Sequence, residues 1–305
     1  MPANTFLVTQ ATGEQSKWVI THLLQAGAKV HAVVRDLTKA PVLLHHPNIT
    51  LFQGESKSFD DIYTAAQGCK GAFLNTFPIP GLEALQAQTI VAACEKAGVE
   101  SLVACTTYLT GQKSRWDNED AKKCLLEDYF TSKTQVEAAV RGSSIKAYTI
   151  LRPAILFQDF YLPGAYGNYP RLAEGVLDHA FNDGIKGPFT DAHDVGAYAS
   201  AALLDPARFH QQEIDLASQA LTIAEAHKLL EKASGQNIKL HRRTAEEEED
   251  GVAAIFGQRF QLWSNVETFD IDSTAEKTAN KYGVQFTTLE AALQRDRERL
   301  TYLAL

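Results

Sequence analysis

The sequence predicts an α/β fold: a doubly wound parallel sheet followed by a smaller C-terminal α/β region. Six short apolar runs alternate with helical segments over the first 153 residues. The helical segments are long enough to serve as right-handed crossovers between parallel strands. After Pro153 this alternation ends, and a stretch rich in glycine, proline and aromatic residues begins. We therefore divide the chain into residues 1–153 and a smaller region, residues 154–305, that packs discontinuously on the first.

Apolar runs and helix-end signals define the elements of the first region. The predicted strands are the short apolar runs at residues 5–10, 29–34, 48–53, 71–76, 101–106 and 146–153. The predicted helices are the longer segments at residues 14–26, 58–67, 82–97 and 119–141. Gly27, Gly68 and Gly98 follow three of these helices, as glycine commonly does where a helix ends. Ser58 and Asp61 have the spacing of a capping box.

The second region has weaker signals. We expect residues 157–192 to form loops over a pocket, as in a lid or substrate-binding region. Asp194 is expected to cap a helix that begins at Val195, rather than to form a catalytic dyad with His193. The acidic run EEEED is expected to be a solvated helix face. The other expected elements are strands near 211–217 and 237–242 and helices near 194–204, at 222–234 and from Thr287 onwards.

Composition argues against several function classes. The net charge is −8 and the isoelectric point about 5.6, whereas a nucleic-acid-binding domain needs a basic face. No apolar run approaches the ~20 residues of a membrane span, and we expect no signal peptide. The four cysteines lack CxxC spacing, and His45–His46 lacks metal-ligand spacing. We therefore expect a cytoplasmic protein without metal, membrane or direct nucleic-acid partners, either monomeric or homodimeric.

The turn after the first strand has part of a phosphate-binding pattern. The dinucleotide fingerprint uses three glycines, for a tight turn, close backbone approach and helix packing. Here Gly13 is the middle glycine, and Gln10 and Ser16 stand at the outer positions. Backbone N–H groups at the start of the following helix can still bind phosphate. We expect Gln10 to lengthen or tilt the turn and Ser16 to be small enough to keep the helix close. The alternative is an ordinary turn without a ligand.

The end of the second strand favours a phosphorylated ribose. An acidic residue at this point usually binds the hydroxyls of an unphosphorylated ribose, whereas a cation suits a 2′-phosphate. Arg35 stands there, and Lys39 follows one turn later. We therefore expect NADP(H) to be preferred over NAD(H). Two alternatives remain: Asp36 competes for the ribose, or both cations are solvated.

These features resemble the NmrA-like family of atypical short-chain dehydrogenases/reductases, which have an NAD(P)-binding Rossmann fold. The resemblance covers most of the chain. It rests on ATGEQS, VVRD, PNITLFQG (47–54), GAFLNT (71–76), YFTSK (129–133), LRPAILFQDF (151–160) and DAHDVG (191–196). The family includes redox sensors and transcriptional regulators that bind cofactor without turning it over. It also lies near isoflavone-reductase-like enzymes and quinone reductases, which transfer hydride.

The resemblance implies a cofactor site along the carboxyl edge of the sheet. Its residues would be Thr12, Gly13, Glu14 and Gln15 at the pyrophosphate, Arg35 at the adenosine ribose, Gly54, Glu55 and Ser56 at the adenine, Asn75, Thr76 and Phe77 under the middle of the cofactor, Lys133 at the nicotinamide ribose, and Pro153 to Phe157 at the nicotinamide. Glu55 stands where aspartate is commoner. The glycine-poor turn, also seen among regulators, slightly favours sensing.

Tyr129 and Lys133 are the candidate catalytic pair. Their spacing places both on one face of a helix. In short-chain reductases this tyrosine gives a proton to the substrate oxygen, and the lysine lowers its pKa from about 10 by stabilising phenolate. Thr106 or Thr107, at the end of the fifth strand, would hold the substrate oxygen. The alternative is a half-buried tyrosine beside a solvated lysine.

An aromatic cluster is the candidate substrate pocket. It consists of Phe157, Phe160, Tyr161, Tyr166 and Tyr169. Such residues would accept a flat or hydrophobic organic molecule; the alternative is simple core packing. Two functions follow. The first is an NADP(H)-dependent reductase of a carbonyl, enone or quinone. The second is a redox sensor that binds NAD(P) and acts on a regulatory protein partner, in the cytoplasm or the nucleus.

Overall fold

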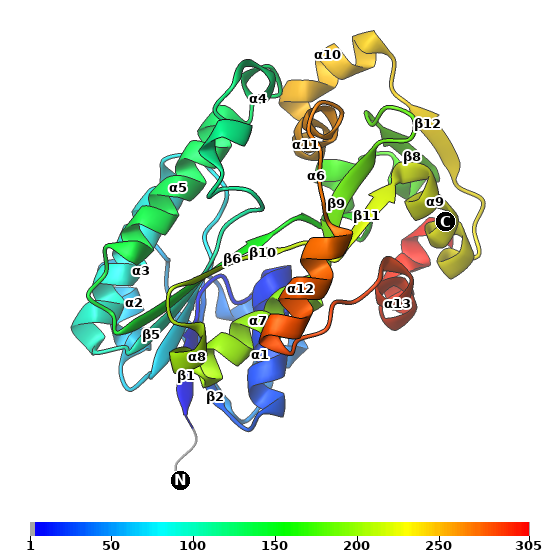
Figure 1. The fold of residues 1–305 in the computed structure, drawn as a ribbon. Helices are drawn as coiled ribbons and strands as arrows, with labels where there is room; N and C mark the ends of the chain where they lie inside the picture. The colour runs from blue at the N-terminus through cyan, green and yellow to red at the C-terminus, as the bar shows by residue number, and fades with distance from the viewer. Residues whose placement is uncertain (1–3, 305) are drawn as a thin grey trace. The chain divides into compact units, whose positions relative to one another are not determined.

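The computed structural model describes residues 4–304, which form two compact units (Figure 1). Unit 1 comprises the chain up to Gly111, Asp128–Pro153 and His193–Asp215. Unit 2 comprises Gln112–Glu127, Ala154–Ala192 and the chain from Leu216 onwards. One junction between the units thus lies directly after Pro153. Residues 193–215 belong to unit 1 and add two helices and a strand to it.

Unit 1 is built on a seven-stranded sheet with the order β10-β6-β5-β4-β1-β2-β3. Its strands are β1 (Thr5–Val8), β2 (Lys29–Val34), β3 (Ile49–Gln53), β4 (Gly71–Leu74), β5 (Ser101–Cys105), β6 (Ala147–Pro153) and β10 (Gln212–Leu216). Neighbouring strands from β3 through to β6 are parallel. Strand β1 pairs with both β2 and β4, so the chain order reverses there. The predicted doubly wound sheet is confirmed, and such reversal points are where these sheets bind ligands.

Helices cover both faces of this sheet (Figure 1). They are α1 (Glu14–Gln25), α2 (Phe59–Ala66), α3 (Leu82–Ala97), α5 (Glu127–Arg141), α7 (Ala192–Leu204) and α8 (Pro206–Phe209). Helices α2, α3 and α5 share one apolar cluster with the sheet, in which Ile62, Ile90 and Val136 are fully buried. Helices α1 and α7 pack together on the opposite face, where a Cβ atom at Gly196 would lie 2.5 Å from Trp18.

Two local predictions in the first half of the chain are wrong in part. The expected helix 119–141 is two helices, α4 (Glu119–Lys123) and α5. The break follows from Leu125, which has a left-handed φ of 55°, and from Leu126, whose N–H closes α4 on the carbonyl of Ala121. The capping box at α2 is half formed. Ser58 accepts from the Asp61 N–H, but the Asp61 carboxylate accepts from the N–H of Glu55.

Unit 2 contains two small sheets, β11-β9-β7 and β12-β8. Its strands are β7 (Ile155–Leu156), β8 (Val176–His179), β9 (Lys186–Thr190), β11 (Gln219–Thr222) and β12 (Lys239–Arg242). Besides α4, its helices are α6 (Ala165–Asn168), α9 (Ile223–Ser234), α10 (Ala245–Ala254), α11 (Phe256–Ser264), α12 (Asp272–Tyr282) and α13 (Leu289–Arg295). Residues 157–192 therefore form more regular structure than the loops expected.

Two expected helix starts are displaced. Helix α7 begins at Ala192, so Asp194 lies inside its first turn instead of capping it, and its carboxylate lies 3.1 Å from His193 Nδ1. Helix α13 is capped by Thr288, one residue after the expected Thr287. All four cysteines are free and buried. Within the described part of the chain, every helix is too short or too polar to cross a bilayer.

Candidate functional site

The turn between β1 and α1 closes without a glycine at its first position. Gln10 has a left-handed φ of 50°, a conformation that glycine adopts more easily. The N–H of Gly13 donates to the carbonyl of Gln10 at 2.8 Å. Gly13 is the N-cap of α1, and no side chain caps the helix. Ser16 is fully buried and donates to the carbonyl of Thr9 at 2.9 Å, so the helix stays close to the strand as expected.

A cleft of about 270 Å³ lies beside this turn, at the carboxyl ends of the central strands. Among the residues that line it are six predicted for the cofactor site: Thr12, Arg35, Gly54, Glu55, Ser56 and Phe77. Gly13, Glu14 and Gln15 follow Thr12 directly at the start of α1. The structure thus brings together the residues expected at the pyrophosphate, the adenosine ribose and the adenine, from three separate strand ends.

Two cations follow β2, but only one of them lines the cleft. Arg35 is exposed at the cleft, and no carboxylate of the described residues forms an ion pair with it. Lys39 lies 3.6 Å from Asp36. Asp36 also accepts hydrogen bonds from the N–H and hydroxyl of Thr38, which lower the pKa of its carboxyl group. Asp36 is therefore engaged with its own turn, whereas the Arg35 guanidinium faces the cleft.

The end of β4 is tied to α3 and to β1 by buried polar groups. The hydroxyl of Thr9 accepts from the Asn75 N–H at 2.9 Å. Thr76 donates its hydroxyl to Glu83 at 2.7 Å, and the Phe77 N–H donates to the Gln86 side chain at 2.9 Å. Phe77 itself is half exposed. The sequence reasoning missed both α3 residues.

Tyr129 and Lys133 lie together on α5, as the spacing predicts. Lys133 Nζ is 5.2 Å from the centroid of the Tyr129 ring, and the Thr107 side chain hydrogen-bonds Tyr129. Lys133 is buried, and its ammonium lies 2.5 Å from the Glu83 carboxylate. The alternative of a solvated lysine is therefore wrong for Lys133.

The expected lowering of the tyrosine pKa does not occur. Burial raises the pKa of Tyr129 above its usual value. The charge of Lys133 and the hydrogen bond from Thr107 act in the opposite direction but are outweighed. Burial would lower the pKa of Lys133, yet Tyr129 and Glu83 together raise it. The phenol therefore stays protonated at neutral pH, because the effect of burial outweighs that of the lysine charge.

The two threonines after β5 have different partners. Thr107 contacts Tyr129, whereas Thr106 donates its hydroxyl to the buried Glu137 at 2.9 Å. Glu137 also accepts two hydrogen bonds from Arg152. Thr106 is thus held in a structural ion-pair network. Of the two residues left open by the sequence, Thr107 has the geometry to orient a substrate oxygen.

Most of the predicted aromatic cluster belongs to the core of unit 2. Four of its members are at most 1% exposed: Phe157, Phe160, Tyr161 and Tyr169. Tyr166 is 61% exposed and is the accessible member of the cluster. The alternative of core packing therefore fits the first four, and Phe157 is fully buried among them. Pro153 is buried at the end of β6 and accepts from the N–H of Tyr108.

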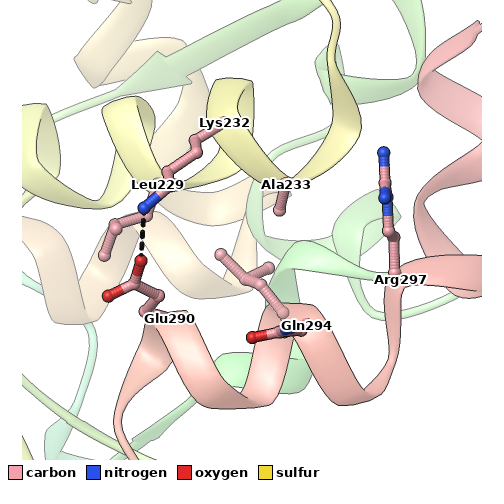
Figure 2. A pocket seen from close by; sticks show the side chains of 7 residues that line it. Leu229, Lys232, Ala233, Glu290, Gln294 and Arg297 are labelled. Carbon is pink, nitrogen blue, oxygen red and sulfur yellow. Dashed lines mark hydrogen bonds and ion pairs between the residues drawn. The ribbon is translucent and has the colours of Figure 1, made fainter.

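A second cavity, of about 360 Å³, lies in unit 2 between α9 and α13 (Figure 2). Its walls are apolar where Leu229 and Ala233 line it, and an ion pair of 2.6 Å between Lys232 and Glu290 lies at one side. Arg297 lies at the other side. No residue predicted for the cofactor or for catalysis lines this cavity.

Comparison with known proteins gives relatives with different activities. The chain is 30% identical over 185 residues to dihydroflavonol 4-reductase of Gerbera hybrida. This match covers 48% of the present chain and 50% of that enzyme. The chain thus spans about half the length of the curated relatives it matches. Its fold is similar to that of an NADPH-dependent quinone oxidoreductase of Escherichia coli solved with NADPH (TM-score 0.71, 23% identity, covering 95% and 99% of the two chains).

The fold is equally similar to that of NmrA, a negative transcriptional regulator solved with NADP (TM-score 0.72, 20% identity, covering 98% and 96%). The same regulator has been solved with NAD. At these identities the two structures establish the fold alone. The profile of the NmrA-like family matches residues 2–293. The chain therefore belongs to the NmrA-like family.

Proposed function

We propose that this protein is an NADP(H)-dependent reductase that transfers hydride to a carbonyl, enone or quinone of an aromatic or hydrophobic small molecule. The observation that carries the proposal is the contact of Thr107, Tyr129 and Lys133 within unit 1. This unit also holds the predicted cofactor cleft. A quinone oxidoreductase and a dihydroflavonol reductase among the similar proteins support hydride transfer.

The residues of the cleft fit a dinucleotide. The uncapped first turn of α1 offers backbone N–H groups to a pyrophosphate, in the way helix N-termini bind phosphate. Gly13 has a neighbouring carbonyl 3.2 Å from where a Cβ atom would stand, so a larger residue would crowd this turn. Arg35 supplies the cation that favours a 2′-phosphate, and Asp36 is occupied by its own turn. The preference for NADP(H) rests on this pair of observations.

The side chains around Tyr129 have the groups that carbonyl reduction needs. A bound reduced nicotinamide would supply the hydride, two electrons with one proton. Thr107 would turn its hydroxyl from Tyr129 to the substrate oxygen and donate a hydrogen bond to it, and Tyr129 would give that oxygen its phenolic proton as the negative charge develops. Lys133 would stabilise the phenolate that remains until solvent returns the proton. Hydride and proton together convert the carbonyl to an alcohol.

A second function is favoured by one observation. Burial raises the pKa of Tyr129, and the pairing of Glu83 with Lys133 leaves less positive charge to support a phenolate. A redox sensor would need the cleft and Lys133 but would not use the tyrosine proton. Such a protein would act on a regulatory partner protein instead of a small-molecule substrate, and the fold of the regulator NmrA is consistent with this alternative.

Steady-state turnover separates the two functions. The purified protein is incubated with NADPH and a panel of quinones and aromatic ketones, and absorbance at 340 nm is followed. For a reductase we expect Tyr129→Phe to lower kcat by about 10²- to 10⁴-fold, the usual contribution of a positioned acid. Tyr148→Phe, a matched change on β6 of the same unit, leaves kcat unchanged. Tight NADPH binding without turnover supports the sensor. Failure to bind any dinucleotide overturns both functions.

A further inference from the structure

Glu83 is a buried carboxylate that no sequence motif explains. It stands in the first turn of α3 and is 0% exposed. Its Oε1 atom accepts from Lys133 Nζ at 2.5 Å and from the Thr76 hydroxyl at 2.7 Å. Its Oε2 atom is buried and has no hydrogen-bond partner among the described residues. Burying a carboxylate is costly, and removal of one partner of such a pair leaves an uncompensated charge. The pair therefore calls for a functional explanation.

The geometry places Lys133 between two groups of different charge. On one side is the Glu83 carboxylate, at 2.5 Å, and on the other the Tyr129 ring, whose centroid is 5.2 Å away. The remaining titratable group that faces Tyr129 is Cys105, whose burial raises its pKa to about 12, so that the thiol is neutral. Thr107 contributes a hydrogen bond without charge. The balance between Lys133 and Glu83 therefore decides the charge that Tyr129 experiences.

We propose that Glu83 is a positioning residue that fixes Lys133 beside the end of β4 and offsets the charge of the lysine at Tyr129. Lys133 points away from solvent and toward α3 because Glu83 accepts from its ammonium. The same carboxylate holds Thr76, which the family resemblance places under the cofactor. Glu83 thus joins the residue expected at the nicotinamide ribose to the residue expected beneath the cofactor.

The consequence is a proton donor that keeps its proton until it is needed. Because the Glu83 carboxylate lies beside the ammonium of Lys133, it weakens the pull of the lysine charge on the phenol of Tyr129. Without Glu83, the full ammonium charge would act on Tyr129. The inference rests on the proposed function for the role of Tyr129 as a donor. The coupling of the three charges is a property of the cofactor-free protein and is measured there.

The test is a titration of Tyr129 in the cofactor-free protein. Tyrosine is labelled with ¹³C at Cζ, the chemical shift is followed with pH, and the Tyr129 signal is assigned by its loss in Tyr129→Phe. We expect Glu83→Gln to lower the pKa of Tyr129 by about one pH unit, a change of about tenfold in its ionisation constant. Glu95→Gln, which removes the same charge near the other end of α3, leaves it unchanged. A pKa that stays within about 0.2 of the wild-type value, or rises, overturns the proposal.

A second pair of variants keeps the test decisive if Glu83→Gln does not fold. Lys133→Met removes only the cation and should raise the pKa of Tyr129 further. The double variant with Glu83→Met removes both charges, and the pKa should return toward the wild-type value because the two charges offset each other. Equal pKa values in the single and double variants overturn the proposal. None of these measurements needs turnover, so they can fail while the reductase assay succeeds, and the reverse.

Discussion

Replacement of Arg35 by glutamine should change the choice between the two nicotinamide cofactors. Arg35 is exposed at the cleft without a carboxylate partner among the described residues, so its charge is available to a ligand. The side chain of glutamine keeps hydrogen-bonding capacity but loses the positive charge. We therefore expect Arg35→Gln to weaken NADPH binding and to leave NADH binding nearly unchanged.

The expected magnitude follows from the exposure of the guanidinium. A hydrogen bond between charged groups contributes about 1.5–3 kcal/mol when it is sheltered. At a solvent-exposed position, screening reduces such contributions toward about 1 kcal/mol. Because a 2′-phosphate carries up to two negative charges, we expect Arg35→Gln to lose about 1.4 kcal/mol of NADPH binding free energy, which is about tenfold in Kd. The loss should shrink at higher salt, because exposed charges are screened within about 10 Å at 0.1 M.

Isothermal titration calorimetry with NADPH and NADH, at two salt concentrations, measures this difference directly. The matched control is Lys39→Gln, because Lys39 is exposed and paired with Asp36 at 3.6 Å. It should change neither Kd by more than about twofold. Equal loss of NADPH and NADH affinity in Arg35→Gln would show that the arginine does not contact the 2′-phosphate. If Lys39→Gln selectively weakened NADPH binding, Lys39 and not Arg35 would be the residue that contacts the 2′-phosphate.

Two further predictions concern stability. Gly196→Ala should lower the free energy of unfolding by about 1–3 kcal/mol, because the new Cβ atom would lie 2.5 Å from the Trp18 backbone; an unchanged urea midpoint contradicts this. Burial and two neighbouring arginines lower the pKa of His179 to about 4. The unfolded chain therefore takes up this proton first as the pH falls below about 6.5, and stability should drop by about 3 kcal/mol between pH 6.5 and 4. His179→Gln should flatten that pH dependence, and an unchanged slope in urea titrations refutes it.

The order of strands and helices in unit 1 could be predicted because each element has a simple local signal. The strands are short apolar runs, and helices such as α3 end at a glycine, here Gly98 in the left-handed conformation. The break between α4 and α5 had no such signal. Leu125 adopts a left-handed φ although it is neither glycine nor asparagine, because Leu126 is fully buried and its N–H closes α4. Tertiary packing decided that boundary, and the local sequence does not encode it.

The candidate site could be predicted where a motif fixes the backbone. It was harder to predict where a side chain contacts a residue of another element. Tyr129 and Lys133 share a helix face by spacing alone. The choice between Thr106 and Thr107 depends on which side of the strand end each hydroxyl faces, and that is set by Glu137 on another element. The sequence around Glu83 contains no pattern that indicates a role in the site. A glutamate in the first turn of a helix is common for its favourable interaction with the helix dipole, so its burial against Lys133 could not be anticipated.

The start of α3 links the two parts of the candidate site. Glu83 and Gln86 lie one turn apart and bind successive residues at the end of β4, namely Thr76 and Phe77. Glu83 also holds Lys133, which stands beside Tyr129. A ligand that displaces Thr76 or attracts Lys133 must therefore change the charge balance at Tyr129. A reductase would use that change to release the proton of Tyr129, whereas a sensor would need only the rearrangement of Lys133. Both functions therefore require that Lys133 responds to the cofactor. The pKa of Tyr129, measured with and without NADP, reports that response.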